Sequence, residues 1–498
     1  MAIGPTLGTG LFVGIGQALA VGGPASLIIS YVFLSVLVYF VTTATAEVST
    51  HSLARNGAMI AHTYHYSSSH LGFAISYLRW CALAVFVPFE VTTAMVHLGL
   101  WEPSGRMALR MGVVTGVIVA FNMLPDKLFR RSQAFFTCIK FSAMVGILGV
   151  SSYLAIRASA DENVKGFLYW REPGPFNQFL LRGGMGRALG LVDCLLCSTI
   201  AFVFIPELTV QRAEQHDTEP GNSIFRRTRN SNIVFFVLYI LSSFASTVMA
   251  PSTDPSLTNN GTGAGLSPFV VGVNNSHVRV IPGVTTALIL ISSVASGRSF
   301  LHLSSRMLTS MAETGHAPAM FMVRNRWEVP YVSVGVSAGF TWLTFLCMAV
   351  SSSAVHNYLM FFITTSGYIS WICSGITYLR FRQVANDADI MPVHRSFVQP
   401  YGTWFALVAS TLLALLNCLQ IIVAHTHLFN PWNAIPGYIS LGMFSLMYLG
   451  HRLVTAVRNK AAQFKAPSVK ARHEAEDGEG HGQDLELHEV DPTPYSIS

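Results

Sequence analysis

Charged residues are scarce in this sequence. Asp, Glu, Lys and Arg make up 11% of its 498 residues, compared with about a quarter of an ordinary soluble protein. Hydrophobic residues make up 51%, and the mean hydropathy is +0.46. This is too little charge to cover several soluble domains, so the composition predicts a polytopic membrane protein.

Several other signals are missing as well. We find none of the short alternating segments that are typical of β-barrel spans. The seven cysteines, Cys194 and Cys197 among them, are scattered through apolar stretches and indicate neither a disulfide framework nor a metal site. No strand precedes the glycines at 183–186, and no nucleophile elbow or catalytic carboxylate pair is present. We therefore expect no enzyme activity, no cofactor and no metal.

Long apolar windows are present instead, and each can cross a bilayer as a helix. The sequence predicts an all-α fold with about twelve transmembrane helices, followed by a disordered cytosolic tail at 456–498. The predicted spans are 2–20, 25–47, 72–98, 108–124, 134–156, 188–208, 233–250, 283–308, 331–350, 355–379, 403–424 and 433–453.

Lys and Arg predict the orientation of these spans. With the N-terminus in the cytosol, 20 of the 31 Lys and Arg residues fall on the inner side, 8 on the outer side and 3 within spans. Both termini are therefore expected in the cytosol, and the net charge of +6 follows from this bias rather than from nucleic-acid binding. Two sequons, at Asn260 and Asn274, then lie in an outer loop where glycosylation is possible.

The first span is apolar but rich in glycine, with the sequence IGPTLGTGLFVGIG at residues 3–16. Non-helical backbone survives inside a bilayer only where it lines a cavity or packs against protein. A break at Gly8-Thr9-Gly10 would expose N–H groups that can hold a carboxylate. Close packing of helices through small residues is the alternative.

A second break is expected in the sixth span, where Pro206 and Glu207 end an apolar run. Proline removes a backbone donor and interrupts a helix. A carboxylate near membrane depth is a functional candidate. Alternatively, Glu207 only marks the cytosolic end of the helix.

Besides the first-span stretch, eight further stretches follow one another along the chain: AEVSTHSLARNGA (46–58), VPFEVTTA (87–94), IKFSAMVGILG (139–149), GFLYWREPGPFN (166–177), SSRMLTSMAETGHAP (304–318), VPYVSV (329–334), YLRFR (378–382) and QPYGTWFAL (399–407). Taken in this order, they resemble the amino acid permeases of the amino acid–polyamine–organocation superfamily, and the loop features resemble its fungal branch. The resemblance covers residues 2–455, which we interpret as a single permease transmembrane domain.

The resemblance implies a fold of the leucine-transporter type, in which spans 1–5 and 6–10 form inverted halves with broken helices 1 and 6. It implies that the first-span break, including Thr6, Gly8, Thr9 and Gly10, holds the carboxylate of an amino acid. The substrate amino group would face carbonyls of spans 1 and 6. In the sixth span, the implied substrate residues are Phe204, Ile205, Pro206 and Glu207.

The resemblance also implies uptake driven by protons, and three residues are candidates for the coupling. Lys140 matches a fifth-span lysine that lies near the ion site of sodium-driven relatives, and a buried lysine loses its charge readily. A structural charge or a side chain that snorkels to the surface is the alternative. Glu90 and Glu207 are the candidate carboxylates, and Glu90 can instead pair with Lys140, Arg79 or Arg298.

The eighth span carries Ser296, Arg298 and Ser299, whose polar groups either complete the site or bond within their helix. Arg298 replaces the asparagine usual in the fungal permeases. It can pair with Glu90 or Glu207, meet an acidic substrate, or face the cytosolic vestibule. The usual Gly-Thr-Glu is replaced by Ile205-Pro206-Glu207, and a Ser-Gly pair by Ile363-Thr364.

The sequence thus predicts a multi-pass plasma-membrane transporter that imports amino acids by proton symport, with the lipid bilayer as its surroundings. A transporter-like amino acid sensor is one alternative. A permease for another organic cation, such as a polyamine or choline, is the other.

Overall fold

The protein is described by a computed structural model over residues 9–12, 14–51, 58–98, 107–157, 166–216, 222–258, 265–275, 281–387, 396–417 and 438–460. Within these ranges the chain is helical and contains no strand, which confirms the predicted all-α class. The chain forms two units, residues 1–447 and 448–498. In the second unit, residues 448–460 are helical, a few residues past the predicted start of the tail at 456. Everything below concerns the first unit.

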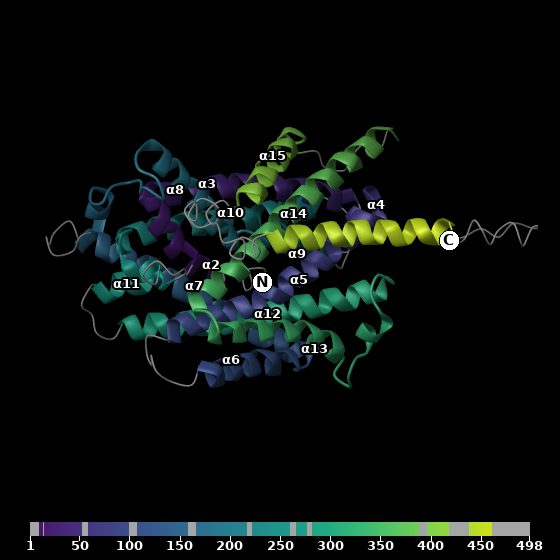
Figure 1. Ribbon diagram of the computed structural model, residues 1–498, viewed down its shortest axis with the longest axis horizontal. Helices are drawn as coiled ribbons and strands as arrows, with labels where there is room; N and C mark the ends of the chain where they lie inside the picture. The colour runs from purple at the N-terminus through teal and green to yellow at the C-terminus, as the bar shows by residue number, and fades with distance from the viewer. Residues whose placement is uncertain are drawn as a thin grey trace, which may run out of the picture. The chain divides into compact units, whose positions relative to one another are not determined.

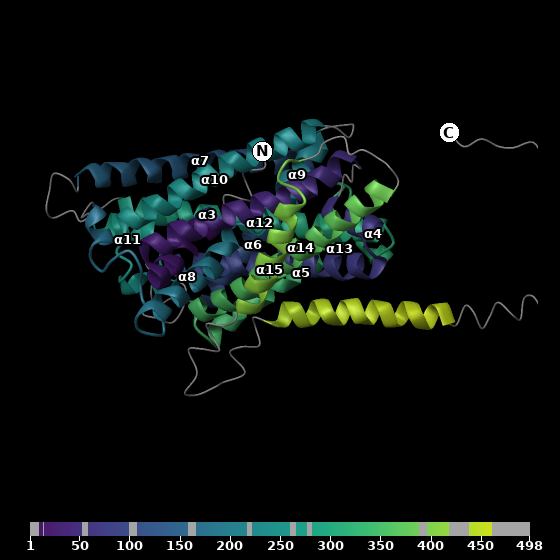
Figure 2. The same cartoon turned by 90° about the horizontal axis from the view of Figure 1, so that it is seen from above.

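The elements of the first unit are mostly long helices (Figures 1 and 2). The α-helices are α2 (Thr9–Phe12), α3 (Gly14–His51), α4 (Ala58–Tyr66), α5 (Ser69–Leu98), α6 (Met107–Asn122), α7 (Asp126–Arg157), α8 (Gly184–Ser198), α9 (Ile205–His216), α10 (Asn222–Met249), α11 (Pro268–Asn275), α12 (Ile281–Glu313), α13 (Tyr331–Gly339), α14 (Ser352–Asp387) and α15 (Tyr401–Leu416). Short 3₁₀ helices are η1 (Gly166–Trp170), η2 (Thr199–Ala201), η3 (Pro255–Thr258), η4 (Ala319–Met322) and η5 (Phe340–Met348).

Among the described residues, eight helical segments are long and apolar enough to cross a bilayer. Two shorter apolar helices, α6 and α15, match the predicted spans at 108–124 and 403–424. Several helices start earlier than predicted; α10, for example, starts at Asn222 rather than 233. Hydropathy finds only the apolar part of such a helix, whereas its basic end continues the helical hydrogen bonding into polar surroundings.

Residues 14–20 of the predicted span 1 and all of the predicted span 2 lie in α3, which is kinked at Gly23. This glycine has φ 83° and ψ 174°, a backbone conformation open only to glycine, and Pro24 follows it. The loop before α8 satisfies the backbone groups around the kink: Asn177 N donates to Gly22 O at 3.0 Å, and Ala25 N donates to Pro175 O at 2.9 Å. The loop therefore serves as the cap of the kink.

Replacing Gly23 with alanine is expected to destabilise the protein strongly. The added Cβ would lie 2.8 Å from Asn177 N and 3.0 Å from Pro175 O, in a conformation that itself costs about 1–3 kcal/mol for an L-residue. Thermal unfolding of the detergent-purified, fluorescently tagged protein measures the effect. Gly149→Ala is the control, because nothing lies within 4 Å of its Cβ position. Equal melting temperatures for the two variants would contradict the account of the kink.

The predicted sixth span is interrupted. Helix α8 ends at Ser198, η2 and a turn follow, and α9 begins at Ile205. Pro206 is the second residue of α9, where a missing N–H costs nothing because N–H groups of the first turn have no partner within the helix. The interruption therefore precedes the proline, over residues 199–204.

The core is built around α3, α5 and α12. Helices α5 and α12 run side by side, α3 packs against α8 and α10, and α14 packs against α5 and α15 (Figure 1). Large apolar side chains also point outward from α6, α7, α10 and α15, such as Val113, Phe135, Leu241 and Val408. Apolar surface spread over several helices is what a bilayer covers.

Candidate functional site

The break in the sixth span lies directly against the start of the chain. A Cβ added to Gly10 in α2 would lie 3.3 Å from the Cα of Ala201 in η2, and one added to Gly14 would lie 3.0 Å from the Ile200 side chain. The two glycine- and proline-marked segments of the sequence therefore meet. Of the predicted break at Gly8-Thr9-Gly10, Thr9 and Gly10 are helical, as the first two residues of α2, whereas Gly8 and Thr6 lie outside the described residues.

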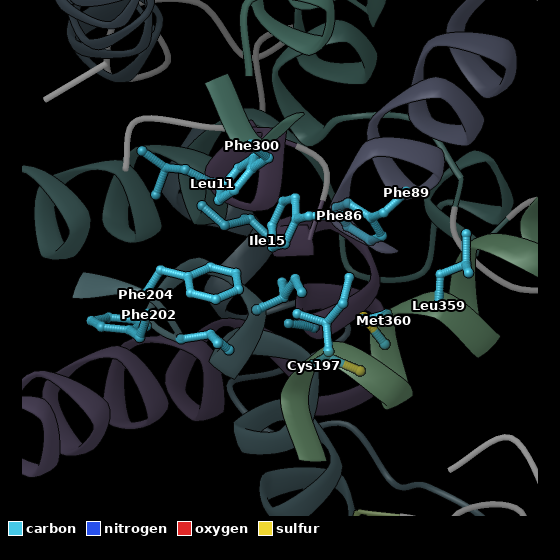
Figure 3. Packing of buried hydrophobic residues seen from close by; sticks show 14 of the residues in the cluster. Leu11, Ile15, Phe86, Phe89, Cys197, Phe202, Phe204, Phe300, Leu359 and Met360 are labelled. Carbon is cyan, nitrogen blue, oxygen red and sulfur yellow. The ribbon is translucent and has the colours of Figure 1, made fainter. Parts of the chain in front are cut away.

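Three aromatic rings form a cluster beside this contact. Phe86 of α5 and Phe300 of α12 stack with their centroids 4.0 Å apart, and Phe204 lies 5.4 Å from each. Leu11 and Ile15 of the first segment lie close to Phe86 and Phe300 (Figure 3). All three rings are buried. The described residues next to the sixth-span interruption and α2 therefore form an apolar, aromatic surface.

A cavity of about 890 Å³ adjoins this cluster through Phe204. Glu207, Ser299 and Gln133 also line it. Its lining includes further charged residues, namely Asp126, Arg130, Arg212, Arg306, Glu313 and Arg324. A volume of this size falls within the range of small-molecule sites.

Glu207 forms an ion pair with Arg79 of α5, and both side chains are almost fully buried. Arg79 also lies 4.4 Å above the ring of Phe204 and donates a long hydrogen bond of 3.5 Å to Ser370 Oγ. The sequence suggested Arg79 only as a partner for Glu90. Glu207 does more than mark a helix end, since its carboxylate occupies a buried pair at the cavity.

Lys140 of α7 is 2% exposed, so it does not snorkel to the surface. Its Nζ donates a hydrogen bond of 2.6 Å to Ser296 Oγ on α12. Glu90 of α5 is fully buried, attracts the Lys140 ammonium, and lies 3.5 Å, Cβ to Cβ, from a methyl group placed on Gly297. Lys140, Ser296 and Glu90 thus form one buried polar cluster from three helices.

Arg298 lies in none of the places suggested for it. Its guanidinium lies among the rings of Phe121, Phe129 and Phe136, at 4.6 to 5.2 Å. It donates hydrogen bonds of 2.7 Å to Ser132 Oγ and to Gln133 Oε1. Pairing with Glu90 or Glu207 is therefore wrong, and Arg298 is not among the residues that line the cavity. Cation–π contacts and α7 hydrogen bonds satisfy the charge instead.

The two span-eight serines have different surroundings. Ser299 donates to Ala295 O at 2.7 Å within its own helix and lies 3.0 Å from Gln133 Oε1. Ser296 accepts the bond from Lys140. Ser299 therefore bonds both within its own helix and to Gln133 on α7, so bonding within the helix accounts for only part of its surroundings.

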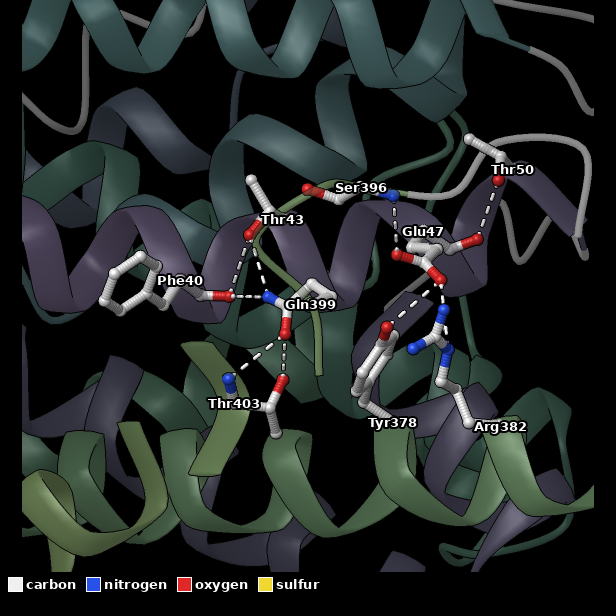
Figure 4. Close-up of polar contacts among 9 residues, drawn as sticks. All are labelled: Phe40, Thr43, Glu47, Thr50, Tyr378, Arg382, Ser396, Gln399 and Thr403. Carbon is white, nitrogen blue, oxygen red and sulfur yellow. Dashed lines mark hydrogen bonds and ion pairs between the residues drawn. The ribbon is translucent and has the colours of Figure 1, made fainter. Parts of the chain in front are cut away.

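Sequence reasoning missed a second buried carboxylate site. Glu47 of α3 is fully buried and accepts hydrogen bonds from Tyr378 OH at 3.0 Å and from Ser396 N at 3.2 Å (Figure 4). Arg382 Nε lies 3.6 Å from Glu47 Oε1 and forms an ion pair with it (Figure 4). Tyr378 and Arg382 of α14 cover its carboxylate, although its place at the end of the second predicted span suggests contact with cytosolic water. No spacing in the sequence links Glu47 to these partners, which lie more than 300 positions further along the chain.

The structure describes only one of the two asparagines predicted as glycosylation sites. Asn274 is exposed on α11, near the end of that helix at Asn275. Asn260 lies outside the described residues.

Comparisons with known proteins agree along almost the whole chain. The sequence profile described as "Amino acid permease" matches residues 1–465. The chain is 32% identical to the probable proline-specific permease put4 of Schizosaccharomyces pombe over 453 residues, which are 90% of this chain and 82% of the relative. It is also 32% identical to the proline-specific permease of Emericella nidulans, over 91% of this chain and 83% of the relative.

A solved structure shares the fold. A crystal structure of a mutant of the Eremococcus coleocola manganese transporter matches with a TM-score of 0.54 at 15% identity, covering 92% of this chain and 93% of that chain. At this identity the likeness shows the fold alone.

Proposed function

Because the chain belongs to the amino acid permease family and is a multi-pass membrane transporter rather than an enzyme, we propose that it imports amino acids across the plasma membrane by proton symport. The observation that carries the proton-coupling part is the buried cluster of Lys140, Ser296 and Glu90. It offers a basic and an acidic group that are almost completely shielded from water.

The substrate is proposed to lie between the two breaks. Its carboxylate would accept hydrogen bonds from N–H groups around Thr6, Gly8, Thr9 and Gly10, where the positive end of a helix favours an anion. Its amino group would face carbonyls of the first span and of Phe204, Ile205 and Pro206. The close approach of Gly10 to Ala201 supports this, because it brings both sets of backbone groups together.

Lys140 is proposed to carry the transported proton at Nζ. As an ammonium it donates to Ser296 and is attracted by Glu90. Losing the proton removes the attraction to Glu90 on α5 and weakens the hydrogen bond to Ser296 on α12. Protonation of Lys140 can therefore bias how the helices of the two halves pack, which is what coupling requires.

Five spans in each half, inverted relative to one another, are proposed as the architecture, with twelve spans in total. In the predicted orientation the cavity opens to the cytosol, since the residues that line it include Arg130, Arg306 and Arg324, which the positive-inside bias places on that side. The structure would then correspond to the state that releases substrate inward.

Uptake of radiolabelled amino acids tests the proposal. We expect uptake in cells that lack their own permeases to be several-fold faster at external pH 5 than at pH 7.5, because an inward proton gradient drives it. Proline belongs first in the panel, since two relatives are named for it. Surface delivery is checked through a fluorescent tag, and a protonophore should abolish the difference.

The alternatives give different results. A well-delivered protein that binds amino acids but transports none would support a sensor. Inhibition by a polyamine or choline, with no response to amino acids, would support an organic-cation permease. Uptake of amino acids that does not depend on pH or protonophore would remove the proton from the proposal.

A further inference from the structure

An ion pair of opposite charges lies where the aromatic cluster meets the cavity, since Phe204 of the cluster and Glu207 of the pair both line it. Arg79 is 3% exposed and Glu207 9%, and the pair joins α5 to the first turn of α9. The cluster of Phe86, Phe204 and Phe300 touches the pair through Phe204, whose ring lies under the guanidinium. Any ligand that lies between the breaks and leaves through the cavity passes this pair.

Glu207 lies in the first turn after the sixth-span interruption, beside the proposed substrate position, and two positive groups offset its charge. Arg79 pairs with it directly, and its place in the first turn of α9 puts it at the positive end of the helix. Its negative charge is therefore largely cancelled before a ligand arrives. A cationic side chain of a substrate would therefore be attracted only weakly, because Arg79 already pairs with the Glu207 carboxylate.

The other acids of the cavity are compensated in the same way. Of the described residues that line it, the acids are Asp126, Glu207 and Glu313. Arg306 pairs with Asp126, and Arg324 donates to Glu313 at 2.6 Å. Arg130 and Arg212 add further positive charge to the lining. The path therefore offers a cation no uncompensated acid among these residues.

We propose that Arg79 determines the charge selectivity of the transporter: by neutralising Glu207 it makes the site accept amino acids with uncharged side chains and reject lysine, arginine and polyamines. This inference rests on the proposed function. The reverse also follows, because Glu207 neutralises Arg79 and so denies an acidic amino acid its cation. The aromatic cluster, apolar apart from the guanidinium over Phe204, then suits a small apolar side chain.

Three glutamine variants test the pair reciprocally. Arg79→Gln leaves the Glu207 carboxylate without its cation, so lysine should inhibit uptake of the neutral substrate at a concentration at least about tenfold lower than in the wild type. Glu207→Gln leaves the guanidinium unpaired, so glutamate should gain inhibition by a similar factor. The double variant restores a neutral pair, and neither charged amino acid should gain.

Ligand-induced thermal stabilisation of the detergent-purified, fluorescently tagged proteins is the second readout, with lysine, glutamate and proline as the probes. It requires binding but no transport cycle. Arg324→Gln with Glu313→Gln is the matched control, since that pair also lines the cavity but is 44% and 40% exposed. It should leave the ranking of the three ligands unchanged.

The outcomes separate the two proposals. Absence of uptake by the wild type would overturn the transport proposal, while the ranking in the stabilisation measurement still decides the role of Arg79. An unchanged ranking in both single variants would overturn charge selectivity by Arg79. If one single variant fails to fold, the other and the double variant still give the reciprocal comparison.

Discussion

Replacing Lys140 with alanine is expected to lower uptake at pH 5 by about tenfold or more. The change removes a buried amine and its bond to Ser296. A hydrogen bond to a charged group is worth about 1.5–3 kcal/mol, and about 1.4 kcal/mol corresponds to a factor of ten. The difference between pH 5 and pH 7.5 should disappear with it. Initial rates, divided by the amount of protein at the cell surface, measure both effects.

Lys127→Ala is the matched control, because Lys127 lies on the same helix, α7, and is exposed. It should leave both the rate and the pH dependence unchanged. A Lys140→Ala protein that is delivered normally and remains faster at pH 5 would exclude Lys140 as the proton carrier. Glu90 would then be the carboxylate to test next.

Replacing Gly10 with valine is expected to abolish uptake almost completely. The first atom of any side chain already lies 3.3 Å from Ala201 Cα and 3.4 Å from Ala201 N, which is tighter than ordinary contact. Valine adds two more carbons in the same direction, against backbone that cannot rotate away. Helix α2 and the sixth-span interruption must then separate, at a cost of about 1–3 kcal/mol or more, and the groups proposed to bind substrate move apart.

Gly116→Val on α6 serves as the comparison, because nothing lies within 4 Å of its Cβ position. It should transport like the wild type. Melting temperature and surface delivery distinguish loss of function from loss of folding in Gly10→Val. Normal uptake by a well-folded Gly10→Val protein would show that the close approach is not needed for transport.

The helices were predictable from composition, and the interruption of the sixth span was predictable to within a few residues from Pro206. Apolar runs have a strong signature because each must cross the bilayer. Pro206 marks the start of α9, since the interruption itself precedes it at residues 199–204. The ends of the helices were less predictable. The basic start of α10 is helical although it is polar, so hydropathy placed its boundary eleven residues late, at 233 instead of 222.

The partners of the buried charges were not predictable from the sequence. Arg79, Arg298 and Lys140 were recognisable as charges within spans, but a partner depends on how each helix is rotated about its axis. Arg298 illustrates this, since its cage combines one ring from α6 with two from α7. Glu47 is a second case, because it meets Tyr378 only once α3 and α14 are packed.

The cap on the α3 kink has a mechanical consequence. Gly22, Gly23 and Ala25 contact or bond the loop that leads into α8, and a methyl group on Gly190 of α8 would lie 3.2 Å from Val21 O. Main-chain atoms thus hold the kink of α3, the loop and α8 together, and these contacts hardly depend on which side chains are present. We expect these three segments to move as one rigid body. Flexibility in a transport cycle then falls to residues 199–204 and to α9, which has a separate start and carries Glu207.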